Sequence, residues 1–224
     1  MKRAFTLAEV LITLGIIGVV AALTIPTLIQ NHQKQVTVNK LKKVYTTLNN
    51  ALTKAEAEYG DREGWRFDSS DTVDCDGLDV YCKYLRGNLK VIKDVDCDRR
   101  TNAKIVLADG TTIAPENYIT PLGGMSDIIR VDLNGETGPN KDGHDQFLFV
   151  NSIKYGFAPL GFCDQKVSEW GYKYCIAAET GDREQVKQAG CNENSQAYCG
   201  ALIMLDNWQI SKDYPKTKSE HSYW

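Results

Sequence analysis

Residues 10–29 read VLITLGIIGVVAALTIPTLI, a run of twenty positions without a formal charge. A helix of this length rises about 30 Å at about 1.5 Å per residue, which matches the hydrocarbon core of a bilayer. The run lies near the start of the chain and follows the basic residues Lys2 and Arg3. The sequence therefore predicts one transmembrane helix over residues 10–29.

One acidic residue, Glu9, stands directly before this apolar run. An unpaired acid inside a bilayer costs about 2.5–3.5 kcal/mol on insertion scales, so such a residue normally has a partner and a function. The alternative is a first-turn acid that the helix dipole favours by at most about 1 kcal/mol. The larger burial cost favours a role for Glu9 in assembly. A secretory signal cut near Ala22 is a second alternative, against which Glu9 also argues.

The residues around Glu9 read Arg3-Ala4-Phe5-Thr6-Leu7-Ala8-Glu9. This stretch resembles the processing site of type IV prepilins and of the pseudopilins of type II secretion, with Ala4 in place of the usual glycine. The resemblance implies that a prepilin peptidase removes residues 1–4 as a leader, methylates the new amine of Phe5 and leaves the apolar helix on the protein. It also implies that Glu9 meets the amino terminus of a neighbouring subunit during filament assembly.

Small residues and one proline mark the apolar run. Gly15, Gly18, Ala21 and Ala22 follow one another at spacings that let helices approach closely in lipid, although such residues are also common in membrane helices generally. Pro26 matches the prepilin pattern as well. Because proline lacks an amide hydrogen and clashes with the preceding turn, we expect a helix kink or local melting near Pro26.

Beyond residue 29 the helix pattern continues in amphipathic form. Apolar residues recur at spacings of three and four, at Val38, Leu41, Tyr45, Leu48, Leu52, Ala55 and Tyr59. We therefore expect one helix over residues 5–59, with residues 30–59 packed on a globular head formed by residues 60–224. A coiled coil is the rival interpretation, but about three heptads are marginal for one.

The head carries strand and turn signals. Residues 104–113 read KIVLADGTTI, two short strands around an Asp-Gly turn, which is a strong hairpin signal. Residues 129–133 alternate as a further strand, residues 147–150 form a short apolar one, and Asp182 and Gly190 bound a short helix. The expected fold class is α+β, a long N-terminal helix on an antiparallel sheet. The prepilin resemblance implies the same pilin-like architecture.

Seven cysteines all lie after the long helix, at Cys75, Cys82, Cys97, Cys163, Cys175, Cys191 and Cys199. This density favours an oxidising compartment and disulfides, and no CxxC pair or histidine cluster indicates zinc. Cys163 with Cys175 and Cys191 with Cys199 would close short local loops, and the odd number leaves one cysteine over. Lysines beyond residue 29 would by themselves place the head in the cytoplasm. The cysteines and the processing motif place it outside.

The most chemical-looking part of the head is the segment 132–145, DLNGETGPNKDGHD. Carboxylate, amide and glycine residues recur there every two or three positions, as in loops that bind hard cations. The pattern departs from an EF-hand, and turn formation alone also explains such residues. The calcium hypothesis names Asp132, Asn134, Glu136, Asn140, Asp142 and Asp145 as ligands.

Composition and motifs argue against two other classes of function. The net charge is −3 and no basic stripe with interleaved aromatic residues occurs, so we expect no direct nucleic-acid binding by this chain. No nucleophile elbow, phosphate loop or dinucleotide fingerprint occurs, so we do not expect an enzyme and identify no catalytic residue.

The sequence thus predicts a structural subunit of a type IV pilus or of a type II secretion pseudopilus. Its expected partners are the prepilin peptidase, other pilin or pseudopilin subunits, the assembly machinery and the membrane. Its expected location is the inner membrane, crossed once with the head outside the cytoplasm, and then the filament. The alternative is a membrane-anchored extracytoplasmic module that binds calcium or a glycan and does not polymerise.

Overall fold

The computed structural model describes residues 6–62, 65, 81–94, 104–115, 128–135, 137–152, 154–162 and 175–215. The chain divides into two compact units, Met1–Val36 and Thr37–Trp224, and the helix α1 (Leu7–Tyr59) contributes to both. The predicted long helix is therefore present. The outer part of α1 belongs with the head, which here begins at residue 37.

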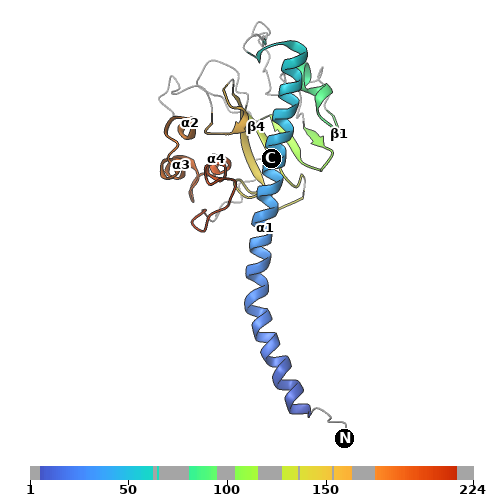
Figure 1. Ribbon diagram of the computed structural model, residues 1–224, viewed down its shortest axis with the longest axis vertical. Coiled ribbons are helices and arrows are strands. Elements are labelled where there is room, and N and C mark those ends of the chain that lie inside the picture. Colours follow the sequence, from blue (N-terminus) through green and yellow to red (C-terminus); the bar gives the residue numbers. More distant parts are fainter. Residues whose placement is uncertain are drawn as a thin grey trace. The chain divides into compact units, whose positions relative to one another are not determined.

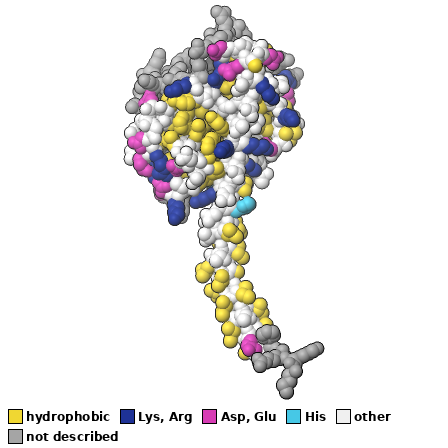
Figure 2. Space-filling model, viewed as in Figure 1, with side chains coloured by type: hydrophobic (Ala, Val, Ile, Leu, Met, Phe, Trp, Pro, Cys, Tyr) yellow, Lys and Arg dark blue, Asp and Glu magenta, His cyan; other side chains and the backbone are white. Residues whose placement is uncertain are grey.

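The described part of the first unit is the apolar stretch of α1. Its large apolar side chains are exposed, from Leu7 at 78% to Val36 at 38%. Figure 2 shows apolar side chains along the visible side of this stretch. The helix has a window of mean hydropathy 2.3 that is long and apolar enough to cross a membrane. This is the composition of a membrane anchor.

The second unit is built on a six-stranded antiparallel sheet. The strands follow one another in space as they do in sequence: β1 (Val91–Lys93), β2 (Ile105–Leu107), β3 (Thr112–Pro115), β4 (Ile128–Asp132), β5 (Gln146–Ser152) and β6 (Gly156–Pro159). The Asp-Gly hairpin is confirmed, with Ile105 opposite Ile113 and Gly110 at φ +86° in the turn. That positive φ is one that glycine adopts without strain.

Short helical elements complete the head. Two of them precede the sheet, a π-helical turn over Tyr81–Leu85 and a 3₁₀ turn over Arg86–Asn88. Three follow it: α2 (Ile176–Thr180), α3 (Arg183–Gly190) and α4 (Cys199–Leu205). They lie together in Figure 1, and α4 contacts β5 and β6. The predicted helix with Asp182 at its start is α3, where the Asp182 carboxylate accepts from the Glu184 and Gln185 amides.

The sheet is covered on both faces. Seven side chains of α1 are buried in the head: Val38, Leu41, Val44, Leu48, Ala51, Leu52 and Ala55. They form one core cluster with the odd-numbered strand residues Ile129, Val131, Phe147 and Phe149. The even-numbered Ile128 and Leu148 join a second cluster with α2, α3 and α4. The alternation follows from the two-residue period of a strand, and it explains why β4 and β5 are apolar on both faces.

Asn49 of α1 closes one edge of the sheet. Its Nδ2 donates to Phe157 O at 2.8 Å, and its Oδ1 accepts from Phe157 N at 3.2 Å. The amide thereby takes the place of a neighbouring strand beside β6, whose open groups would otherwise need water or another partner. Gly156 makes room for this contact, since a Cβ there would lie 2.1 Å from Asn49 Oδ1.

Candidate functional site

The start of α1 holds Glu9 in a capping box with Thr6. Glu9 Oε2 accepts from Thr6 N and from Thr6 Oγ1, both at 2.8 Å, and Thr6 Oγ1 accepts from Glu9 N at 3.3 Å. These contacts satisfy amide groups that the first turn of a helix leaves open. Within one chain, Glu9 thus caps the first turn of α1, and its role in assembly stays a prediction. Ala4 and Phe5 lie outside the described residues.

The apolar stretch of α1 satisfies its polar groups by itself. Thr13 Oγ1 donates to Val10 O and Thr24 Oγ1 to Val20 O, each at 2.9 Å. Such bonds let a hydroxyl group enter lipid without an open donor. A Cβ added at Gly15 or Gly18 would meet no described atom within 4 Å. These glycines therefore serve no packing contact within the described chain.

The helix continues through Pro26 without interruption. Local melting, one of the two expected outcomes, does not occur there. The kink stays a prediction.

The carboxylates of the 132–145 segment bind donors of the protein. Asp145 Oδ1 accepts from Lys141 N at 2.6 Å, and its Oδ2 accepts from Asn140 N at 2.9 Å and Asn134 Nδ2 at 3.0 Å. Asp132 accepts from Asn134 N at 3.1 Å and from Gln146 Nε2 at 2.9 Å. Burial raises the pKa of Asp132, against the effect of these hydrogen bonds.

Asp142 in the same segment forms an ion pair with Arg130. Asn134 Oδ1 is buried and has no hydrogen-bond donor among the described residues. No group of three or more His, Cys, Asp or Glu side chains arranged for a metal occurs in the described part of the chain, and Glu136 lies outside it. The described contacts build a turn, and the calcium hypothesis stays a prediction.

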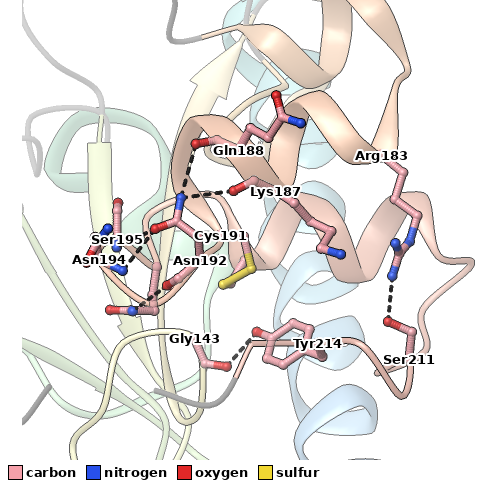
Figure 3. Close-up of a disulfide and its surroundings, with 12 residues drawn as sticks. Gly143, Arg183, Lys187, Gln188, Cys191, Asn192, Asn194, Ser195, Ser211 and Tyr214 are labelled. Carbon is pink, nitrogen blue, oxygen red and sulfur yellow. Dashed lines mark hydrogen bonds between the residues drawn. A yellow bond between two sulfur atoms is a disulfide. The ribbon is translucent and has the colours of Figure 1, made fainter. Parts of the chain in front are cut away.

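A disulfide lies beneath this segment. Cys191 and Cys199 are bonded, as the local pairing predicted, and they join the end of α3 to the start of α4. Gly143 packs on the bridge, since a Cβ there would lie 3.1 Å from Cys199 Sγ, and its φ is +73°. Figure 3 shows Tyr214 beside Gly143. The Tyr214 hydroxyl donates to Gly143 O at 2.6 Å. Burial raises the pKa of Tyr214.

Cys82 and Cys175 are disulfide-bonded too. Cys163, the predicted partner of Cys175, lies outside the described residues. Between Cys191 and Cys199, Asn192 organises the short loop: its Nδ2 donates to Lys187 O and Gln188 O, each at 3.1 Å, and its Oδ1 accepts from Asn194 N at 2.9 Å (Figure 3).

Two groups of residues were not predicted from the sequence. One is the ion-pair cluster around Arg183, which binds Asp206 and Asp213. The other is a pocket beside α1 that three lysines line, Lys43, Lys54 and Lys90. Thr47, Asn50 and Lys54 follow Lys43 at helical spacing, which was a signal for one wall. Nothing local linked this wall to Lys90.

The sequence matches a family of unknown function (DUF6613) over residues 27–217. The chain belongs to this family, which includes most of the head and excludes the apolar run before Thr27. No curated protein and no solved structure matches the chain.

Proposed function

We propose that the protein is a structural subunit of a type IV pilus or of a type II secretion pseudopilus. A prepilin peptidase cleaves it between Ala4 and Phe5 and methylates Phe5, and the mature helix then carries it from the inner membrane into the filament. The observation that carries the proposal is the start of α1, where one carboxylate, that of Glu9, precedes an exposed stretch without a formal charge over residues 10–29.

The apolar stretch needs a partner outside its own chain. None of the described residues before Val38 is buried, and Gly15 and Gly18 have no neighbouring side chain. A glycine inside a helix costs about 1 kcal/mol relative to alanine, which a contact between helices in lipid offsets. Lipid surrounds this surface before assembly, and the helices of neighbouring subunits surround it afterwards.

Glu9 supplies the charge for registering one subunit against the next. A carboxylate and an ammonium group are each expensive in lipid and become tolerable as a pair. The capping box occupies Glu9 Oε2 from the side of Thr6, and the methylated amine of a neighbouring subunit is the cation that the proposal pairs with this carboxylate.

The head belongs outside the cytoplasm in this proposal. The bridge between Cys191 and Cys199 and the bonded state of Cys82 and Cys175 suit an oxidising compartment. Two of the lysines that opposed this orientation have roles in the head. Lys40 Nζ donates to Leu133 O at 3.0 Å, and Lys43 pairs with Asp109 at 2.9 Å. Because these two lysines have structural roles in the head, they are weaker indicators of which side of the membrane the head lies on.

Mass spectrometry of the native amino terminus tests the processing step. The proposal expects a chain that begins at methylated Phe5. A chain that begins after Ala22 would instead support a secreted protein, and an uncut Met1 would support a membrane-anchored module that does not polymerise.

A pair of variants separates the two roles of Glu9. Glu9→Gln keeps a side chain that fits a capping box but removes the charge, whereas Thr6→Val keeps the charge and removes the capping hydroxyl. In cells that hold the assembly machinery, we expect Glu9→Gln to abolish incorporation into sheared filaments or cross-linked pseudopili. Thr6→Val should retain most of it. Equal incorporation of Glu9→Gln and wild type would exclude the charge-pairing role.

A further inference from the structure

A pocket of about 320 Å³ opens in the head, within the unit that begins at Thr37. Three parts of the chain form its walls: one face of α1, the residues just before β1, and the end of β2 with the turn that follows. Its lining is Lys43, Thr47, Asn50, Ala51, Lys54, Asn88, Lys90, Leu107, Ala108 and Asp109. The volume is at the lower end of the range for small-molecule sites.

The pocket is positive in a chain of net charge −3. Three lysines and one aspartate line it, which gives 3 − 1 = +2. Lys43 Nζ lies 2.9 Å from Asp109 Oδ2. Lys54 and Lys90 have no ion-pair partner among the residues that the structure describes. Two lysines from different parts of the chain therefore line the same pocket, and neither has an acidic partner in the part of the chain that the structure describes.

Asp109 is held as an anion in this wall. Burial raises the pKa of Asp109, but hydrogen bonds from Lys43 and from Thr111 outweigh burial and leave the pKa below its usual value. The backbone bond from Thr111 N to Asp109 Oδ1, 3.1 Å long, also fixes the side chain within the β2–β3 turn. Asp109 thus neutralises Lys43 and leaves a net charge of about two for a ligand.

The type of cationic side chain indicates which class of anion the pocket would bind. Lysine acts as a point charge and binds phosphate groups well, whereas arginine predominates where a planar carboxylate is held by two parallel bonds. The lining contains no arginine. A phosphate monoester carries about −1.5 to −2 at pH 7, which balances the two free lysines, and a single carboxylate does not. Thr47, Asn50 and Asn88 add polar groups, and Ala51 and Leu107 add an apolar wall for carbon atoms.

We propose that this pocket binds a phosphate monoester, with Lys54 and Lys90 on the phosphate and α1 as its wall. The phosphate group belongs either to a small soluble molecule or to a lipid headgroup. This inference goes beyond the proposed function and holds whether or not the protein assembles into filaments.

Isothermal titration calorimetry of the full chain in zwitterionic micelles, with glycerol 3-phosphate as the probe, tests the proposal. Replacing both free lysines (Lys54→Gln with Lys90→Gln) should weaken binding roughly tenfold or more, because each removes a charge-assisted contact. Lys42→Gln is the matched control: Lys42 is exposed on the same helix but does not line the pocket. The control should bind as the wild type does.

Two further measurements test the charge balance of the pocket. Asp109→Asn keeps the acceptor for Thr111 N and frees Lys43, so it should bind the probe several-fold more tightly. Lowering the pH from 7.5 to 5 should weaken binding. The second pKa of a phosphate monoester is about 6, so the probe becomes a monoanion at pH 5 while the lysines stay charged.

The outcomes are decisive in each direction. Equal losses of affinity in the double variant and in Lys42→Gln would overturn the proposal. So would the absence of measurable heat when the wild type is titrated with glycerol 3-phosphate and with vesicles that contain phosphatidic acid. Binding of glycerol 3-phosphate supports a soluble ligand. Binding only to phosphatidylcholine vesicles that contain phosphatidic acid, with the same dependence on Lys54 and Lys90, supports a lipid headgroup.

Discussion

Asn49 lies within a helix, yet its side chain hydrogen-bonds as a neighbouring strand would. It donates to Phe157 O and accepts from Phe157 N, and its Nδ2 also donates to Tyr45 O at 2.8 Å. One amide therefore satisfies both backbone groups of an edge residue. Covering an edge in this way protects a sheet from pairing with other chains.

Asn49→Ala should lower the free energy of unfolding by about 1–3 kcal/mol, because it leaves the backbone groups of Phe157 without their partner. Urea denaturation of the full chain in detergent, followed by the tyrosine and tryptophan signal, measures this loss. Asn39→Ala is the control, since Asn39 is exposed on the same helix, and it should change stability by no more than about 0.5 kcal/mol. Equal effects of the two variants would contradict the role of Asn49.

At the scale of elements, Arg183 ties the chain after α4 back onto α3. Its guanidinium donates to Asp206 Oδ1 at 2.6 Å, to Ser211 Oγ at 2.7 Å and to Asp213 Oδ1 at 2.6 Å. Lys187, one turn further along α3, reaches Asp213 Oδ2 at 2.8 Å. Hydrogen bonds from Arg183, then from Lys187 and Ser211, hold the pKa of Asp213 far below its ordinary value of 3.8.

This cluster predicts a dependence of stability on pH. A depressed pKa in the folded state contributes stability that is present above the unfolded pKa and is lost as the pH falls through and below about 4. The wild type should therefore melt at a higher temperature than Asp213→Asn at pH 7, and the difference should shrink towards pH 3. Thermal denaturation at both pH values measures this difference, with Glu179→Gln as a control at an exposed acid. A difference independent of pH would mean that the carboxylate charge is not what Arg183 recognises.

At the scale of the whole molecule, burial begins abruptly at Val38. None of the described residues before it is buried, while α1 contributes seven buried side chains from there to Ala55. Because unit 1 buries no described side chain, a chain of residues 31–224 should be soluble without detergent. Its melting temperature, followed by circular dichroism, should stay within a few degrees of that of the full chain. A large loss would show that the head needs its membrane segment to fold.

Features with local causes were open to prediction from the sequence. The turn at Asp109 and Gly110, the capped start of α3 at Asp182 and the short bridge from Cys191 to Cys199 each depend on residues close together in the chain. The helix pattern before Tyr59 is as strong, because seven apolar residues repeat it. The apolar start of α1 was predictable for the same reason, because twenty successive residues without a charge are a strong signal of a transmembrane helix.

Features that join distant residues were not open to prediction. Asn49 and Phe157 are 108 positions apart, and nothing near either residue marks the contact. The strand β6 contains Gly156 and Pro159, which are typical of loops, and only its position at the sheet edge permits the proline. The helix α4 reads CGALIML, an apolar run without helical periodicity, because it packs in the core on most of its sides. The phosphate pocket combines three such distant parts.

The order of the strands has a consequence for how the protein is made. Each strand from β2 to β6 pairs with the strand that precedes it in the chain, so the sheet can grow by adding neighbours and no strand waits for a later one. The contacts with α1 span long separations in the sequence, as between Asn49 and Phe157, yet α1 is synthesised first. In the topology that we propose, it is already in the membrane when the head crosses. The strands of the nascent sheet therefore pack against α1, which is synthesised before the first strand.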